Sequence, residues 1–124
     1  ATMFFSNAGH NPVVIYDSSN EKVIERNVKG TAIGFSDNYN FKLDKIKLSY
    51  NDVLVFYTDG ITEAENAEGE LFGIDRLKKC VEELKDLSSE KIKNGILTKV
   101  DEFRNGYIQV DDITLVVLKY KGWI

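Results

Sequence analysis

Apolar runs separated by polar residues predict short β-strands in the first part of the chain. Residues 3–5 mark the end of one strand, and residues 13–16 form a second apolar run. Asp, Ser and Asn in the segment 17–20 favour a turn, because their side chains bond back to the nearby backbone. We therefore expect a β-hairpin whose second strand lies within residues 22–28.

Three further strands are predicted downstream. Residues 41–50 alternate between apolar and polar with one slip at 44–45, which indicates a strand with a bulge or bend. Residues 53–57 are continuously apolar, as in a strand that is buried on both faces. Residues 114–120 provide the last strand.

Two helices are predicted between these last two strands. Apolar residues recur every three to four positions over 74–87 and again over 92–103, and we expect both stripes to pack into the core. Ser88 or Ser89 can cap the second helix, and Glu90 in its first turn is favoured by the helix dipole. Strands followed by helices and one last strand predict an α+β layered domain.

Composition narrows the class of protein. The 124 residues suit one domain or part of one, and the apolar share of 43% and charged share of 29% are those of a soluble globular protein. A net charge of −4 argues against nucleic acid as a partner, since phosphate binding needs clustered Lys and Arg. No apolar run reaches the ~18 residues of a membrane span. The lone Cys80 fits a reducing compartment, so we expect a cytoplasmic protein.

Carboxylates stand where two predicted strands end. Asp59 lies two residues after the apolar run 53–57, and Asp111 and Asp112 precede the last strand. If these strands are neighbours, the carboxylates converge, and two of them about 5 Å apart repel by roughly 3 kcal/mol at an effective dielectric constant of 20. A divalent cation would reverse that repulsion. Oxygen ligands favour Mg²⁺ or Mn²⁺ over zinc.

Each of these features also has a structural explanation when it is taken alone. The Asp-Gly pair at 59–60 is a common turn dipeptide, and Asp111 or Asp112 can satisfy backbone N–H groups in a tight turn. His10 is most simply a loop residue, and the glutamates within 63–70 form a solvated acidic loop.

The combination of motifs resembles a known family. The chain contains "NAGHNP" at 7–12, glycines at 30 and 34, "NDVLVFYTDGITEAEN" at 51–66 followed by "GELFG", and "DDITLVVL" at 111–118. This set resembles the bacterial SpoIIE/RsbU-type phosphatases, a branch of the metal-dependent PP2C-like protein serine/threonine phosphatases. One departure is Asn51, where the family usually has Gly, and it affects only a turn.

The resemblance covers residues 1–124 as the C-terminal portion of one catalytic domain, without the upstream acidic metal-binding strand. It implies a layered PP2C-like β-sandwich flanked by helices, of which this chain holds mostly antiparallel strands and two helices before the last strand. On that basis we expect the 124-residue chain to be inactive by itself. We also expect a homodimer that continues or exchanges strands, with Phe4, Val14, Val55 and Val117 as candidates for the uncovered surface.

The resemblance also implies a site. Asp59 and Asp111 match metal-ligating aspartates, while Asp112, Gly60 and His10 are candidates for residues beside the ligands. Gly60 would let the backbone turn sharply. The intact domain would hold two Mn²⁺ or Mg²⁺ ions, and a metal-activated water, with no catalytic side chain beyond it, would hydrolyse phosphoserine or phosphothreonine. The substrate would be a phosphorylated regulatory protein, such as an anti-sigma-factor antagonist.

Two other classes remain open at this point. One is a non-catalytic phosphatase-like module used for interaction and regulation. The other is a haloacid-dehalogenase-like enzyme, in which Asp59 would be a nucleophile at a strand end. That fold expects a second Asp two residues later, where this chain has Ile61.

Overall fold

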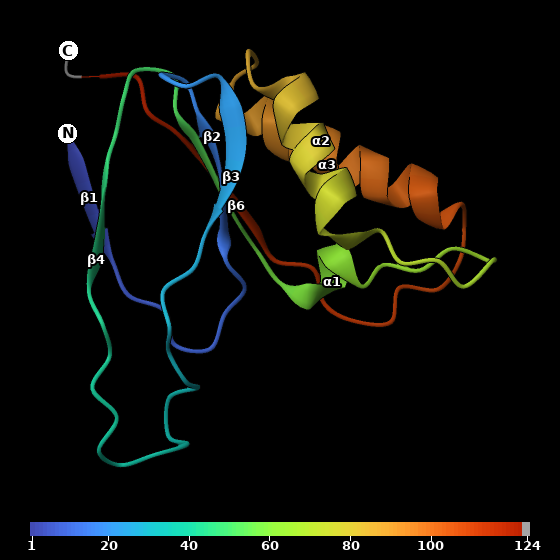
Figure 1. The fold of residues 1–124 in the computed structure, drawn as a ribbon. Helices are drawn as coiled ribbons and strands as arrows, with labels where there is room; N and C mark the ends of the chain where they lie inside the picture. The colour runs from blue at the N-terminus through green and yellow to red at the C-terminus, as the bar shows by residue number, and fades with distance from the viewer. Residues whose placement is uncertain (123–124) are drawn as a thin grey trace.

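The computed structural model describes residues 1–122 as six β-strands and three α-helices (Figure 1). The observed order matches the prediction, with five strands, then the helices, then one strand. A short first helix directly follows the fifth strand and was not predicted. The elements are β1 (Thr2–Phe5), β2 (Val13–Asp17), β3 (Lys22–Arg26), β4 (Asp44–Lys47), β5 (Val53–Tyr57), α1 (Asp59–Thr62), α2 (Gly73–Leu84), α3 (Ser89–Arg104) and β6 (Leu115–Lys119).

The strands form two antiparallel sheets. One has the order β3-β2-β5-β6, and the other consists of β1 and β4. Figure 1 shows the four-stranded sheet in the middle, with β1 and β4 on one side of it and α2 and α3 on the other. The predicted α+β layered class is therefore confirmed, and the predicted hairpin over 13–28 is the pair β2–β3.

The central strand β5 is buried on both faces, as its continuous apolar run predicts. Val53 and Val55 pack with the helices in the larger core, and Leu54 packs with Val13 and Ile15 in a second core beneath β1 and β4. Successive strand side chains point to opposite faces, so a strand that lies between two layers needs apolar residues at every position.

Capping and packing of the helices follow the predicted pattern. The side chain of Ser88 accepts a hydrogen bond from the backbone N–H of Lys91, so Ser88 is the N-cap of α3 and Ser89 is its first residue. The buried positions of α3 are spaced by four residues, which aligns them on one face toward the core; they are Ile92, Ile96 and Val100.

The turn before β5 joins two distant segments. The buried carboxylate of Asp52 accepts hydrogen bonds from the backbone and hydroxyl of Ser18, at 2.9 and 2.7 Å, and from the backbone of Ser49 at 2.7 Å. Asn51 has a φ of 72°, in the left-handed region that favours glycine and tolerates asparagine. The departure from the family's usual Gly at this position therefore keeps the turn intact.

The predicted strand over residues 41–50 is longer than the observed one. Only β4, Asp44 to Lys47, is a strand, and the slip at 44–45 marks its beginning rather than a bulge inside it. The reason is the pairing partner, because β4 pairs only with the four residues of β1 and its register runs from Asp44 opposite Phe5 to Lys47 opposite Thr2.

The uncovered apolar surface differs from the expected one. Val14 and Val55 are fully buried and pack in the helix-side core, which Val117 also contacts. Phe4 is exposed as expected, and Val116 and Leu118 of β6 are 54% and 37% exposed. Val116 and Leu118 alternate with Val117, so they lie on the opposite face of the sheet, toward β1 and β4. These two strands cover β2 and β5 but leave β6 open.

Within residues 1–122, none of the helices has the length and apolar character that a membrane span requires.

Candidate metal centre at the ends of β5 and β6

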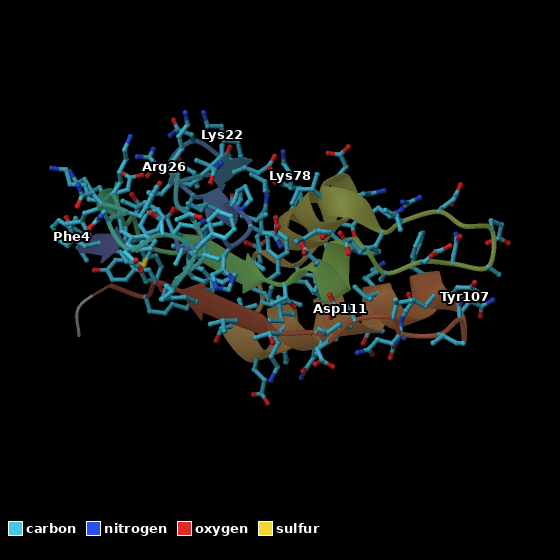
Figure 2. The ribbon with its side chains drawn as sticks, turned by 90° about the horizontal axis from the view of Figure 1, so that it is seen from below. Phe4, Lys22, Arg26, Lys78, Tyr107 and Asp111 are labelled. Carbon is cyan, nitrogen blue, oxygen red and sulfur yellow. The ribbon has the colours of Figure 1, made fainter. Side chains whose placement is uncertain are left out.

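Antiparallel pairing brings the two predicted carboxylate segments to the same edge of the sheet. Tyr57, the last residue of β5, pairs with Leu115, the first residue of β6. Asp59 lies two residues after Tyr57, and Asp111 lies four residues before Leu115. Figure 2 shows Asp111 beside α1, the short helix that begins at Asp59. The two strands are therefore neighbours, which is the condition under which the sequence predicted that the carboxylates converge.

Thr58 ties these two segments together. Its hydroxyl donates a hydrogen bond to the carbonyl oxygen of Asp112 at 3.1 Å and accepts one from the backbone N–H of Thr114 at 2.9 Å. Its own backbone N–H donates to the carbonyl of Thr114 at 3.1 Å. A threonine hydroxyl has one donor and two acceptor sites, so this side chain satisfies both backbone groups at once.

Gly60 has a different role from the expected one. It lies inside α1 and is not among the residues with positive φ, so it does not provide a sharp turn. A Cβ at this position would fall 2.3 Å from the carbonyl oxygen of Asp112. Glycine is needed here because the backbone before β6 packs directly against the first turn of α1.

The Asp59 carboxylate is held by Asn11. Asn11 Nδ2 donates to Asp59 Oδ1 at 2.9 Å, and the same nitrogen lies 3.5 Å from the carbonyl oxygen of Tyr57. Within residues 1–122, no other donor bonds this carboxylate, and Asp59 is exposed. Sequence reasoning gave Asn11 no role, although it is part of the "NAGHNP" motif.

His10 is close to the site in sequence but forms no hydrogen bond with Asp59. Its backbone N–H donates to Asn7 Oδ1 at 2.7 Å, and Asn7 Nδ2 donates to its carbonyl at 2.9 Å. Gly30 closes this loop from outside, because a Cβ there would fall 1.6 Å from the Asn7 carbonyl oxygen. His10 and Asn11 both line a cavity of about 290 Å³. Asn11, and not His10, is therefore the loop residue that reaches Asp59.

Asp111 and Asp112 are used differently. Asp111 Oδ1 accepts a hydrogen bond from the backbone N–H of Asp112 at 2.8 Å, and Asp111 lines a cavity of about 260 Å³ together with Gly60, Glu63 and Glu65. Asp112 does not line this cavity, and its carbonyl is bound by Thr58.

The donor chemistry of the site fits a hard cation, but the number of ligands is small. Asp59 and Asp111 each have one carboxylate oxygen in a hydrogen bond and one that accepts none from residues 1–122. Free carboxylate oxygens are what Mg²⁺ and Mn²⁺ prefer. Among the residues that the structure describes, no three His, Cys, Asp or Glu side chains gather in a way that could hold a metal.

Two other reactive groups, Tyr57 beside the site and Cys80 in the core, stay protonated at neutral pH. Burial, together with the charges of Glu25 and Asp59, raises the pKa of Tyr57 to about 12. Burial also raises the pKa of the Cys80 thiol. An ionised nucleophile at either position is therefore disfavoured, and the thiol packs in the core.

Curated proteins of similar sequence come from two bacteria. Protein IcfG of Synechocystis sp. (strain ATCC 27184 / PCC 6803 / Kazusa) is 34% identical over 119 residues, covering 92% of this chain and 18% of that protein. Phosphoserine phosphatase RsbU of Bacillus subtilis (strain 168) is 30% identical over 119 residues, covering 94% of this chain and 34% of RsbU. The chain thus spans about a third or less of each relative.

Solved structures share the fold. The SiaA-PP2C domain of Pseudomonas aeruginosa superposes with a TM-score of 0.80 at 21% identity, covering 97% of this chain and 47% of that one. The PP2C phosphatase domain of SpoIIE from Bacillus subtilis, solved with a fragment of its regulatory domain, gives a TM-score of 0.75 at 24% identity, covering 97% of this chain and 34% of that one. The family described as stage II sporulation protein E (SpoIIE) matches residues 1–121. The chain therefore belongs to the SpoIIE family and has the fold of part of a PP2C phosphatase domain.

Proposed function

We propose that this chain is part of a metal-dependent protein phosphatase that removes phosphate from phosphoserine or phosphothreonine. The observation that carries the proposal is the position of Asp59 and Asp111 at the adjoining ends of β5 and β6. Family membership supports it, as does the relative named phosphoserine phosphatase RsbU. Because the chain spans a minor part of its relatives, the activity belongs to the full-length protein.

In this proposal Asp59 and Asp111 are ligands of Mn²⁺ or Mg²⁺. A matched structure of the SpoIIE phosphatase domain was presoaked with Mn, which supports this choice of ion. When bound, such ions lower the pKa of a water molecule and neutralise charge on phosphoryl oxygens. The chain's own contribution is to hold the two carboxylates at one sheet edge, with Thr58 joining the segments that bear them.

The substrate we propose is a phosphorylated regulatory protein, such as an anti-sigma-factor antagonist, in the cytoplasm. The buried, protonated Cys80 supports hydrolysis by water, since it is not available for a covalent phospho-enzyme.

A non-catalytic phosphatase-like module is the second candidate. The observation that favours it is that no three potential ligands gather among residues 1–122. The two functions differ in one measurable property, because a binding module retains its partner affinity when the metal is removed and releases no phosphate.

The test is Mn²⁺-dependent release of phosphate from a phosphoserine protein by the full-length protein and its variants. Asp59→Asn and Asp111→Asn should each abolish the activity without unfolding the protein. Asp112→Asn should be milder, because the bonded group of Asp112 is its backbone carbonyl. Asp86→Asn is the matched control, since Asp86 is exposed and lies between α2 and α3.

Near-normal activity in Asp59→Asn or Asp111→Asn would refute the assignment of that residue. A larger loss in Asp112→Asn than in Asp111→Asn would show that Asp112 is the ligand. If the wild-type protein releases no phosphate but binds the phosphoprotein equally well with and without Mn²⁺, the non-catalytic function is the correct one.

A further inference from the structure

We propose that Asn11 is a positioning residue that orients the Asp59 carboxylate toward a cation. The proposal rests on the proposed function, in which Asp59 is a metal ligand. Its basis is the hydrogen bond of 2.9 Å from Asn11 Nδ2 to Asp59 Oδ1, which joins residues 48 positions apart. The Asp59 carboxylate accepts no other hydrogen bond from residues 1–122.

The orientation of the Asn11 amide follows from its surroundings. Both nearby groups, the Asp59 carboxylate and the Tyr57 carbonyl, can only accept hydrogen bonds. The amide nitrogen, with two hydrogens, must therefore face them, and the amide oxygen must point elsewhere. An aspartate at position 11 would repel Asp59, and an apolar residue would leave it without a donor.

The backbone places Asn11 where it can do this. Strand β2 pairs antiparallel with β5, with Val14 opposite Val55. Continuing that register toward the start of β2 puts position 11 opposite Thr58, next to Asp59. Asn7 and Gly30 hold the preceding loop, as described above, so the position of Asn11 is determined from both sides.

Contact with a neutral amide has a specific consequence for the carboxylate. The bond engages Oδ1, and Oδ2 accepts no hydrogen bond from residues 1–122. A carboxylate held by one oxygen presents the other in a defined direction. The amide adds no positive charge that would compete with a cation, as Lys or Arg would. Groups that hold metal ligands in this way typically contribute about 10–100-fold to metal affinity or activity.

The experiment measures the Mn²⁺ dissociation constant of the full-length protein by calorimetry. Asn11→Ala removes the donor and volume, whereas Asn11→Leu removes the donor and keeps similar volume. We expect both to weaken Mn²⁺ binding by about 10–100-fold. Asn20→Ala is the matched control, because Asn20 Nδ2 donates to Asp17 Oδ2 at 2.7 Å in a turn that the proposed site does not include. This control should bind Mn²⁺ like the wild type.

A double-mutant cycle with Asp59→Asn tests whether Asn11 acts through Asp59. In the Asp59→Asn background, Asn11→Ala should cause no further loss of affinity. Further weakening of the same size in that background, or normal Mn²⁺ binding by Asn11→Leu while Asp59→Asn is impaired, would overturn the role of Asn11 alone. Normal Mn²⁺ binding by Asp59→Asn would overturn both this inference and the proposed ligand.

Discussion

The carbonyl oxygen of Asp112 packs against the Cα of Gly60, so closely that a Cβ at position 60 would fall 2.3 Å away from it. The two atoms that this Cβ would meet first are the backbone carbonyl oxygen and carbon of Asp112, which are held in place by the Thr58 hydroxyl and the β5–β6 ladder. The separation between the Asp59 and Asp111 segments therefore depends on the absence of one side chain.

Replacing Gly60 with Ala should separate these segments. We expect Gly60→Ala to lower the free energy of unfolding by about 1–3 kcal/mol, as overpacking usually does, and to reduce phosphatase activity of the full-length protein sharply. Gly95→Ala in α3 is the comparison, because its Cβ would meet the flexible end of the Leu84 side chain at 2.6 Å. The alanine also improves helix propensity by about 1 kcal/mol, which offsets the cost of that close contact. Equal effects of the two variants on activity would contradict this explanation.

The Thr58 hydroxyl should matter for the same geometry. Thr58→Val keeps the shape but removes the donor to the Asp112 carbonyl and the acceptor for the Thr114 N–H. We expect it to lower the free energy of unfolding by about 1–3 kcal/mol and to weaken Mn²⁺ binding, while Thr58→Ser, which retains the hydroxyl, stays close to wild type. Chemical denaturation and calorimetry provide the two measurements. If Thr58→Val and Thr58→Ser have similar free energies of unfolding and similar Mn²⁺ affinities, the methyl group of Thr58 and not its hydroxyl is the important one.

The 124-residue chain alone should not bind Mn²⁺ tightly. Its described residues bring no three potential ligands together, and Asp59 and Asp111 supply only two carboxylates. We expect calorimetry to find millimolar affinity at most and an assay with a phosphoserine protein to find no turnover. Micromolar affinity together with turnover would mean that this chain assembles a complete site by itself.

The isolated chain should also self-associate through β6. One edge of β6 has no partner strand within residues 1–122, and Val116 and Leu118 are exposed beside it. An open edge next to apolar side chains is a template for pairing with a second copy. Light scattering should give a dimer mass for the wild-type chain and a monomer mass for Val116→Lys.

The control for that measurement is Ile33→Lys, which adds the same charge at an apolar loop residue that is 83% exposed. It should remain dimeric. A wild-type chain that is monomeric and unfolds cooperatively would contradict the prediction and show that the open face of β6 is tolerated in water.

Several features follow from the sequence alone because their causes are local. The apolar run 53–57 specifies a strand buried on both faces, and Ser88 specifies the start of a helix through its own hydroxyl. Asn51 takes the left-handed backbone of a tight turn because it is one of the few residues other than Gly that does so readily. The motifs around Asp59 and Asp111 were sufficient to indicate the family.

Other features required the tertiary structure because they depend on strand order and register. The period of two shows that Val116 and Val117 point to opposite faces, but not which face the helices cover. The contacts of Asn11 with Asp59 and of Gly60 with Asp112 join segments about 50 residues apart, and no local pattern marks either pair. They exist because β2, β5 and β6 are neighbours, so that pairing across the sheet, rather than proximity along the chain, assembles the candidate metal centre.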